Sequence, residues 1–169
     1  MRIYLIGFMG CGKTTVGKLL AEKSKARFID LDDAIEHNTN KSINNIFSNQ
    51  GEEIFRMEEQ RALFQTSFDD KIVVACGGGT PCFGLNMKLI EQYGISIYLE
   101  CTNETLYERL SKEKSKRPLI KDLEGVVLKE YIANKLKERK PYYEKANLIV
   151  NANVKLDEIY KQILACYMN

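Results

Sequence analysis

The stretch that most constrains the fold lies near the N-terminus, at residues 7–14, and reads Gly-Phe-Met-Gly-Cys-Gly-Lys-Thr. It matches the G-x-x-x-x-G-K-[ST] pattern of a loop whose backbone amides surround phosphate groups. The apolar run Ile3–Ile6 before it predicts a buried strand, and the helical spacing of residues 16–22 follows it. A strand, a glycine-rich turn and a helix start form an anion site. We expect Lys13 to neutralise the β/γ-phosphates and the Thr14 hydroxyl to bind Mg²⁺.

The size and charge of the chain narrow the possible partners. Its 169 residues are enough for one domain with a sheet core, and the net charge of +2 gives no reason to expect nucleic acid or a membrane. No apolar run is as long as a membrane span, so we expect a cytoplasmic protein. The five cysteines lack a C-x-x-C pair and a nearby histidine ligand, which indicates reduced, mostly buried thiols. The single histidine, His37, is expected on a helix surface.

Short apolar runs alternate with helical patterns along the chain. This alternation predicts a parallel sheet covered by helices on both faces, because parallel strands need a crossover between them. We therefore predict an α/β fold of three layers (α/β/α), the P-loop NTPase fold, with a five-stranded parallel sheet. The expected buried strands span residues 3–6, 27–30, 72–76, 95–99 and 148–150.

Three polar or glycine-rich features come directly after predicted strands. They are the loop at residues 7–14, the acidic pair Asp30 and Asp32, and Gly77-Gly78-Gly79. Ligands bind at the carboxyl ends of the strands in sheets of this kind, so we expect the three features to share one edge. A plain turn needs one glycine, whereas three in a row let the backbone approach a small ligand closely.

Two segments break the regular alternation. Residues 32–68 are mostly helical in pattern and too long for a simple crossover, so we interpret them as an inserted substrate-binding segment within one domain, residues 1–169. Residues 110–122 are basic and contain Pro118, which favours a mobile lid that closes over phosphates. A solvated charged loop explains the lid segment equally well by itself, and the phosphate loop upstream favours the lid.

The acidic pair offers two different roles. In an extended chain, Asp30 and Asp32 point to the same side. One carboxylate could then hold water on Mg²⁺ while the other orients or deprotonates an acceptor hydroxyl. The alternative is that Asp32 or Asp33 only caps the following helix, and Asp33 is the better candidate for that role.

Three arginines are candidates for binding anions or a base. Arg56 lies one helical turn before Glu59, which can hold its guanidinium. A lone pair of this kind is usually an exposed surface pair, but in an inserted segment that faces an anion loop it could instead bind a substrate carboxylate with two hydrogen bonds. Arg139 ends a long basic helix, where it would also stabilise the helix C-terminus. Arg109 could stack on a base through its planar head or lie in solvent.

Together these motifs resemble the shikimate kinase family of P-loop small-molecule kinases. The resemblance covers essentially the whole chain, and the motifs beyond the loop are more specific than the loop itself. The matched stretches are Gly-Phe-Met-Gly-Cys-Gly-Lys-Thr-Thr-Val-Gly (7–17), Phe-Ile-Asp-Leu-Asp (28–32), Ser-Ile-Asn-Asn-Ile-Phe (42–47), Gly-Glu-Glu-Ile-Phe-Arg-Met-Glu-Glu (51–59), Gly-Gly-Gly (77–79), Arg-Pro-Leu (117–119) and Arg-Lys-Pro-Tyr-Tyr (139–143).

The resemblance implies transfer of the ATP γ-phosphoryl group to the 3-hydroxyl of shikimate, in the pathway to chorismate and the aromatic amino acids. It assigns catalysis to Asp32, Lys13 and Arg117, and shikimate binding to Asp32, Arg56, Gly78 and Arg139. It implies one Mg²⁺, held by Thr14 and, through water, by Asp30. It implies nucleotide binding by Gly10, Cys11, Gly12, Lys13, Thr14, Thr15, Arg109, Arg117 and Asn153. We expect a monomer whose partners are ATP and shikimate.

The chain departs from the family pattern at two places. The family usually has a Ser or Thr just before the triple glycine that helps to hold a metal-bound water, and here Ala75 and Cys76 occupy those positions. Cys11 lies in the loop where Ala or Ser is more common, near a helix N-terminus that can lower a thiol pKa. We therefore expect Cys11 to be sensitive to oxidants or alkylators and protected by ATP.

Two other classes of function remain as alternatives. A gluconate kinase would also phosphorylate a hydroxy acid, whereas a nucleoside monophosphate kinase usually shows Asp-Gly-x-Pro-Arg near the third strand, which is absent here. A nucleotide-dependent switch that binds guanine should carry Asn-Lys-x-Asp, and neither Asn-Lys dipeptide of this chain continues that way. The D-x-x-G match at residues 122–125 lies beside the lid rather than after a strand, so we treat it as chance.

Overall fold

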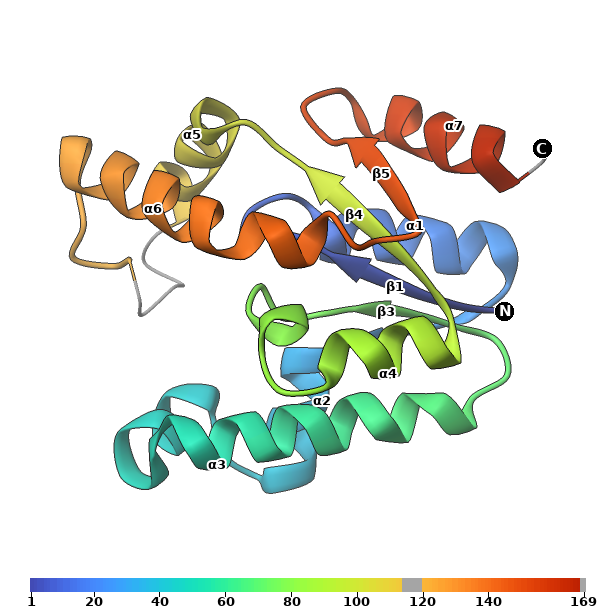
Figure 1. Cartoon of the computed structure of the whole chain (residues 1–169), viewed down its shortest axis with the longest axis horizontal. Helices are drawn as coiled ribbons and strands as arrows, with labels where there is room; N and C mark the ends of the chain where they lie inside the picture. The colour runs from blue at the N-terminus through green and yellow to red at the C-terminus, as the bar shows by residue number, and fades with distance from the viewer. Residues whose placement is uncertain (114–119, 168–169) are drawn as a thin grey trace.

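The sheet has the predicted five parallel strands. The computed structural model describes residues 1–113 and 120–167 (Figure 1). The strands are ordered β2-β3-β1-β4-β5, and every neighbouring pair is parallel. Each strand lies within one residue of its predicted bounds: β1 (Arg2–Ile6), β2 (Arg27–Asp30), β3 (Ile72–Ala75), β4 (Ile95–Glu100) and β5 (Leu148–Asn151).

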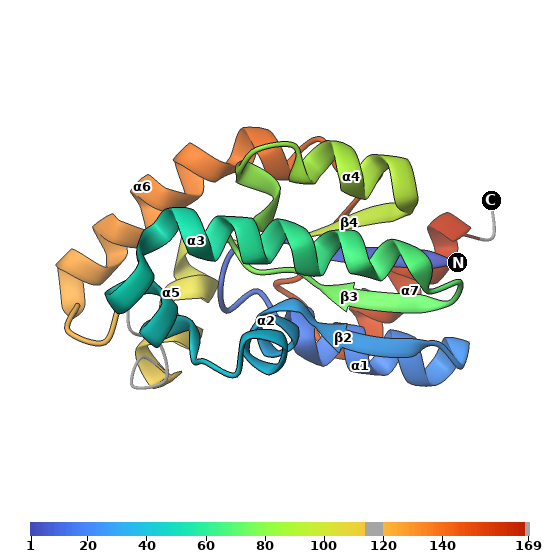
Figure 2. The same cartoon turned by 90° about the horizontal axis from the view of Figure 1, so that it is seen from below.

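Helices cover both faces of the sheet, which confirms the three-layer α/β/α architecture. Figure 2 shows α1 and α7 on one side of the sheet, and α3, α4 and α6 on the other. The helices are α1 (Lys13–Ser24), α2 (Leu31–Thr39), α3 (Ile43–Gln65), α4 (Asn86–Tyr93), α5 (Asn103–Glu113), α6 (Gly125–Tyr143) and α7 (Leu156–Tyr167). Two short 3₁₀ turns, η1 (Thr66–Phe68) and η2 (Thr80–Cys82), complete the described elements.

The core lies around the three central strands. All of β3, all but the first residue of β1 and all but the two end residues of β4 are buried. The expectation of buried strands is wrong for the two edge strands, because β2 has no fully buried residue and β5 has one. An edge strand has a neighbour on one side only, so solvent reaches its other side.

Strand register brings the functional loops to one edge of the sheet. Leu5 of β1 pairs with Ala75 of β3, and Ala75 pairs with Asp30 of β2. The three strands therefore end at the same level, and the segments that follow them start side by side. This is the arrangement predicted from the positions of the glycine-rich and acidic residues.

Residues 32–68 are mostly helical, as predicted, and contain all but the first residue of α2, together with α3 and η1. Within α3, Gly51 has φ 86° and ψ 169°, which breaks the helix into two parts. A positive φ is accessible to glycine at little cost, so Gly51 is the position where the chain can change direction. His37 lies exposed on α2, as predicted.

The predicted lid is only partly described. Residues 114–119 of the expected lid, including Arg117, lie outside the described residues. Before them, Thr102 caps α5 through a 3.2 Å hydrogen bond from the Thr105 amide, and the helix ends at Glu113. Over residues 1–113 and 120–167, none of the helices combines the length and apolar character needed to cross a membrane.

Candidate active site

A cavity of about 990 Å³ opens at the carboxyl edge of the sheet. Most of the residues predicted for the site line it, although they come from six separate segments of the chain. Those that line it are Gly10, Cys11, Gly12, Lys13, Thr14, Thr15, Asp30, Asp32, Arg56, Gly78, Arg109 and Arg139. The fold thus brings together the residues that the sequence placed at strand ends and the three candidate arginines, which lie on helices.

The glycine-rich loop has the backbone shape expected for an anion site. Gly10 and Gly12 have φ values of 81° and 98°, which side chains rarely allow, and Gly12 is the N-cap of α1. The helix begins at Lys13, earlier than the apolar spacing alone indicated. The Lys13 ammonium donates hydrogen bonds to the carbonyl oxygens of Gly7 and Phe8, at 2.8 and 2.9 Å. The loop therefore presents both the helix N-terminus and a fixed cation to the cavity.

Asp30 links the phosphate loop to α2. Its Oδ2 accepts a 2.8 Å hydrogen bond from the Thr14 hydroxyl, and its Oδ1 accepts from the Asp32 amide at 3.2 Å. Asp30 is therefore the N-cap of α2, so the alternative in which Asp32 or Asp33 only caps the helix is wrong. Capping turns the chain into a helix directly after β2, and Asp32 lies in its first turn rather than in an extended chain.

Asp32 is the carboxyl group with the most altered acidity among the described acidic residues. Its pKa is raised from 3.8 to about 6, mainly by burial and also by the nearby charges of Asp30 and Glu59, while Lys13 opposes the change. A carboxyl group with a pKa near 6 is ionised at neutral pH and is a stronger base than an ordinary aspartate.

The triple glycine allows close approach, as predicted. A Cβ on Gly77 would lie 2.9 Å from Asp32 Oδ1, and a Cβ on Gly79 would lie 3.1 Å from Arg56 Nη1. A Cβ on Gly78 would lie 3.4 Å from Arg139 Nη1. None of the three has a positive φ, so the requirement here is space rather than backbone conformation.

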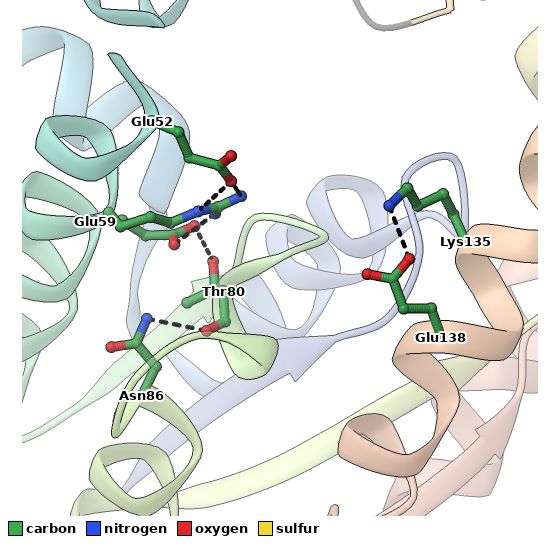
Figure 3. Close-up of polar contacts among 7 residues, drawn as sticks. Glu52, Glu59, Thr80, Asn86, Lys135 and Glu138 are labelled. Atoms are coloured by element: carbon green, nitrogen blue, oxygen red, sulfur yellow. Dashed lines mark hydrogen bonds and ion pairs between the residues drawn. The ribbon is translucent and has the colours of Figure 1, made fainter. Parts of the chain in front are cut away.

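Arg56 is held on two edges and one face. Its Nη1 donates to Glu59 Oε2 at 2.9 Å, which confirms the predicted pair, and its Nη2 and Nε donate to Glu52 Oε1 at 2.9 and 3.2 Å. The guanidinium carbon lies 3.6 Å from the centre of the Phe83 ring. Figure 3 shows Glu52 and Glu59 projecting from α3 on one side and Thr80 reaching Glu59 from the other.

Sequence reasoning missed several of these supports. Glu52 precedes Arg56 by one helical turn, so the spacing rule that found Glu59 could also have found it. Thr80, whose hydroxyl donates to Glu59 Oε1 at 2.7 Å, and Phe83 left no comparable signal, because they reach Arg56 and its partner across the fold.

The end of α6 carries two side chains that lie against the glycine-rich segments: Arg139 lies near the phosphate loop, and Tyr143 contacts the triple glycine. Arg139 lines the cavity, and its guanidinium carbon lies 5.7 Å from the centre of the Phe8 ring. One turn later, the Tyr143 hydroxyl donates to the carbonyl oxygen of Gly78 at 2.5 Å, a contact that the sequence did not suggest. Tyr143 is fully buried, and its ring packs against Tyr98 with the two ring planes tilted by 33°.

Of the two residues predicted to lie beside the nucleotide base, Arg109 lines the cavity and Asn153 does not. Arg109 is partly buried and donates to the carbonyl oxygen of Ala152 at 2.9 Å, which ties α5 to the loop after β5. Asn153 does not line the cavity. Its Oδ1 accepts instead from the Thr102 amide at 2.9 Å, while the nearby Val154 and Leu156 do line the cavity.

The donor set near Thr14 fits a magnesium ion that is bound mainly through phosphate and water. Mg²⁺ prefers oxygen ligands and keeps several waters, and here one hydroxyl and one carboxylate lie together at the phosphate loop. Among the described residues, no group of three or more His, Cys, Asp or Glu side chains is arranged to hold a metal. Cys76, before the triple glycine, is buried, and burial raises its thiol pKa, so it stays a neutral thiol. A thiol is a weaker hydrogen-bond partner for a metal-bound water than the usual hydroxyl.

The expected reactivity of Cys11 is not supported by its surroundings. Its side chain is 1% exposed, so reagents in solution cannot reach the sulfur while the loop keeps this shape. Cys101 is also buried, and Cys82 is partly buried, whereas Cys166 is exposed. The thiols are thus mostly buried, as expected.

Comparison with known proteins identifies the family. The family model "Shikimate kinase" matches residues 9–167. The chain is 46% identical to a shikimate kinase of Azobacteroides pseudotrichonymphae over 149 residues, which are 88% of each protein. The chain belongs to the shikimate kinase family. The resemblance inferred from the sequence motifs is therefore confirmed.

Solved structures agree with this membership. Shikimate kinase from Bacteroides thetaiotaomicron has a TM-score of 0.91 and 34% identity, with 99% of this chain and 97% of that chain covered. Shikimate kinase from Acinetobacter baumannii, solved in complex with shikimate, has a TM-score of 0.87 and 33% identity, with 99% and 92% covered. A gluconokinase from Sinorhizobium meliloti scores 0.67 at 21% identity, with 97% and 89% covered, which shows the shared fold only.

Proposed function

We propose that this chain transfers the γ-phosphoryl group of ATP to the 3-hydroxyl of shikimate, forming shikimate 3-phosphate in the pathway to the aromatic amino acids. The observation that carries the proposal is one cavity that joins the phosphate loop to Asp32 and to two arginines, Arg56 and Arg139, whose guanidiniums lie beside the triple glycine. Membership of the shikimate kinase family supports the choice of substrate, as does the relative solved with shikimate bound.

The acceptor end of the cavity suits a cyclic hydroxy acid. Arg56 and Arg139 would bind the shikimate carboxylate, because both guanidiniums reach the glycine segment at adjacent residues. The backbone of Gly78 would contact the ring hydroxyls, since it lacks a side chain that would fill that space. Asp32 would accept a hydrogen bond from the 3-hydroxyl.

Asp32 is also placed to act as the base. The hydroxyl oxygen attacks the γ-phosphorus, the bond from that phosphorus to the β,γ-bridging oxygen breaks, and the hydroxyl proton passes to Asp32. The raised pKa of Asp32, about 6, suits this transfer because the group is ionised near neutral pH and still basic. Phosphoryl transfer needs alignment and positive charge more than covalent chemistry, and the loop supplies both.

The nucleotide end of the cavity suits a magnesium-bound triphosphate. Backbone amides from Gly10 to Thr15 would surround the phosphates, and Lys13 would neutralise their charge. Thr14, with Asp30 through water, would hold one Mg²⁺, which when bound screens the negative charge of the phosphate oxygens. Arg109 and the loop around Asn153 would flank the adenine. Arg117 would neutralise the transferred group, as the family resemblance implies.

The organisation of the chain is part of the same proposal. Residues 1–169 would act as one shikimate-kinase-like domain, with residues 32–68 as the substrate-binding insertion and residues 110–122 as a lid that closes over the phosphates. We also propose a cytoplasmic monomer.

An assay of ADP release with a panel of acceptors tests the proposal. We expect release with Mg²⁺, ATP and shikimate, and background release with gluconate or nucleoside monophosphates. Preferred turnover of gluconate would instead support the alternative hydroxy-acid kinase.

Two substitutions test the assigned residues. Arg56→Ala should raise the KM for shikimate about tenfold or more, because a charge-assisted pair to the carboxylate is lost, and leave the KM for ATP unchanged. Asp32→Asn should bind ATP and lose most turnover. Normal turnover in Asp32→Asn would remove Asp32 from the mechanism.

A further inference from the structure

The position of the Arg56 guanidinium depends on the Glu59 carboxylate, which is itself oriented by a second hydrogen bond. Glu59 is 1% exposed and accepts from Arg56 Nη1 through Oε2. A buried carboxylate is costly unless each oxygen has a partner. The second oxygen, Oε1, accepts from the Thr80 hydroxyl at 2.7 Å (Figure 3). The orientation of Glu59, and with it the position of the Arg56 guanidinium, therefore depends on a group outside α3.

Thr80 is itself tightly anchored. It is fully buried, its amide donates to the carbonyl oxygen of Gly77 at 3.1 Å, and its own carbonyl oxygen accepts from Asn86 Nδ2 at 3.0 Å. Its branched side chain has few allowed rotamers. A chain of hydrogen bonds thus runs from Asn86 on α4 through Thr80 and Glu59 to Arg56, as the close-up in Figure 3 shows for the labelled residues.

The same segment contacts the other side of the guanidinium. Phe83, which follows η2, lies against the Arg56 plane at 3.6 Å. Stacking limits the tilt of a guanidinium, while the Glu59 pair limits its movement within the plane. By contrast, Glu52 is 57% exposed and can turn into solvent, so it contributes less to a fixed position.

We propose that Thr80 is a positioning residue for the substrate carboxylate, acting on Arg56 through Glu59. The inference rests on the proposed role of Arg56 in binding that carboxylate. Two-point binding of a carboxylate needs an aligned guanidinium plane. Because Thr80 directly follows the triple glycine, it also fixes the distance between Arg56 and the backbone that faces the substrate ring.

Removal of the hydroxyl tests the proposal. Thr80→Val keeps the shape and leaves Glu59 Oε1 without its donor, so we expect the KM for shikimate to rise about tenfold, with kcat and the KM for ATP within about twofold. Thr80→Ser restores a donor and should return the KM to the wild-type value. An unchanged KM in Thr80→Val, or no recovery in Thr80→Ser, would overturn the proposal.

A matched control separates positioning from a general loss of stability. Thr66 is also buried, and its hydroxyl donates to the Leu63 carbonyl oxygen at 2.6 Å. Its other partner is the Tyr4 hydroxyl at 3.0 Å, so Thr66 lies outside the chain of hydrogen bonds that leads to Arg56. Thr66→Val should lower the melting temperature as Thr80→Val does, without changing the KM for shikimate. An equal rise in KM for both variants would show that loss of packing explains the effect.

A double-mutant cycle keeps this inference separate from the proposed function. In an Arg56→Ala background, Thr80→Val should cause no further rise in KM, because its effect passes through Arg56. If wild type does not turn over shikimate, the proposed function fails. If wild type is active and Arg56→Ala raises the KM, but the two substitutions add independently, only the role of Thr80 fails. Should Thr80→Val not fold, Thr80→Ala serves in the same cycle.

Discussion

The hydroxyl of Tyr143 donates a 2.5 Å hydrogen bond to the carbonyl oxygen of Gly78, 65 residues earlier in the chain. This contact joins the end of α6 to the segment that we expect to face the acceptor. Arg139 lies one helical turn before Tyr143 and lines the same cavity. The hydrogen bond therefore fixes the position of this end of α6, and with it Arg139, relative to the backbone of Gly78.

Loss of this hydroxyl should weaken both folding and acceptor binding. In Tyr143→Phe, the buried carbonyl of Gly78 loses its donor, so we expect about 1–2 kcal/mol less stability toward unfolding and a rise of about threefold or more in the KM for shikimate. Urea unfolding and steady-state kinetics measure the two effects. The neighbouring Tyr142 is 39% exposed, and Tyr142→Phe should change neither quantity. Equal behaviour of the two variants would contradict the interpretation.

The acidity of Asp32 predicts how activity depends on pH. If Asp32 must be ionised to accept the hydroxyl proton, kcat/KM for shikimate should fall about tenfold per pH unit below its pKa of about 6. With a base of ordinary aspartate pKa, the enzyme would keep its activity to a much lower pH. The measurement is a kcat/KM profile from pH 5 to 8 at saturating ATP and Mg²⁺. A flat profile down to pH 5 would speak against Asp32 as the base.

The same raised pKa predicts that Asp32 costs stability at neutral pH. The folded state holds the proton up to about pH 6, whereas the unfolded chain loses it near 3.8, so stability falls as pH rises through this window. Asp32→Asn has no such charge and should be about 1–3 kcal/mol more stable than wild type at pH 7.5. The difference should disappear near pH 3.8.

Asp33→Asn is a suitable control for that comparison, because Asp33 is exposed on the same helix. It should give a much smaller gain in stability at pH 7.5. Thermal unfolding of the three proteins across the pH range provides the test. A loss of stability in Asp32→Asn at pH 7.5 would show that Asp32 makes favourable contacts that outweigh its buried charge.

Burial of the thiols predicts the order in which they react. A disulfide reagent should modify Cys166 first, since it is exposed, and Cys11 slowly, because its side chain is 1% exposed. Peptide mapping after limited reaction identifies the modified residue. Rapid modification of Cys11 that ATP suppresses would instead support the expectation from the sequence that this thiol is reactive and protected by ATP.

Much of this protein follows from short-range patterns in the sequence. The phosphate loop, the five strands and the Arg56–Glu59 pair all depend on residues that lie within a few positions of one another. Backbone geometry converts such spacings directly into shared faces and turns. Those features were therefore predictable before the structure was known.

Other features depend on which elements become neighbours, and only the tertiary structure decided them. The Thr80–Glu59 and Tyr143–Gly78 hydrogen bonds, like the bond from Arg109 to Ala152, join segments 21 to 65 residues apart. The role of Asp30 as the helix cap was also missed, because the point where β2 ends and α2 begins was not clear from spacing alone. No local periodicity specifies these contacts, since they arise from the order of the strands and the packing of helices on the sheet.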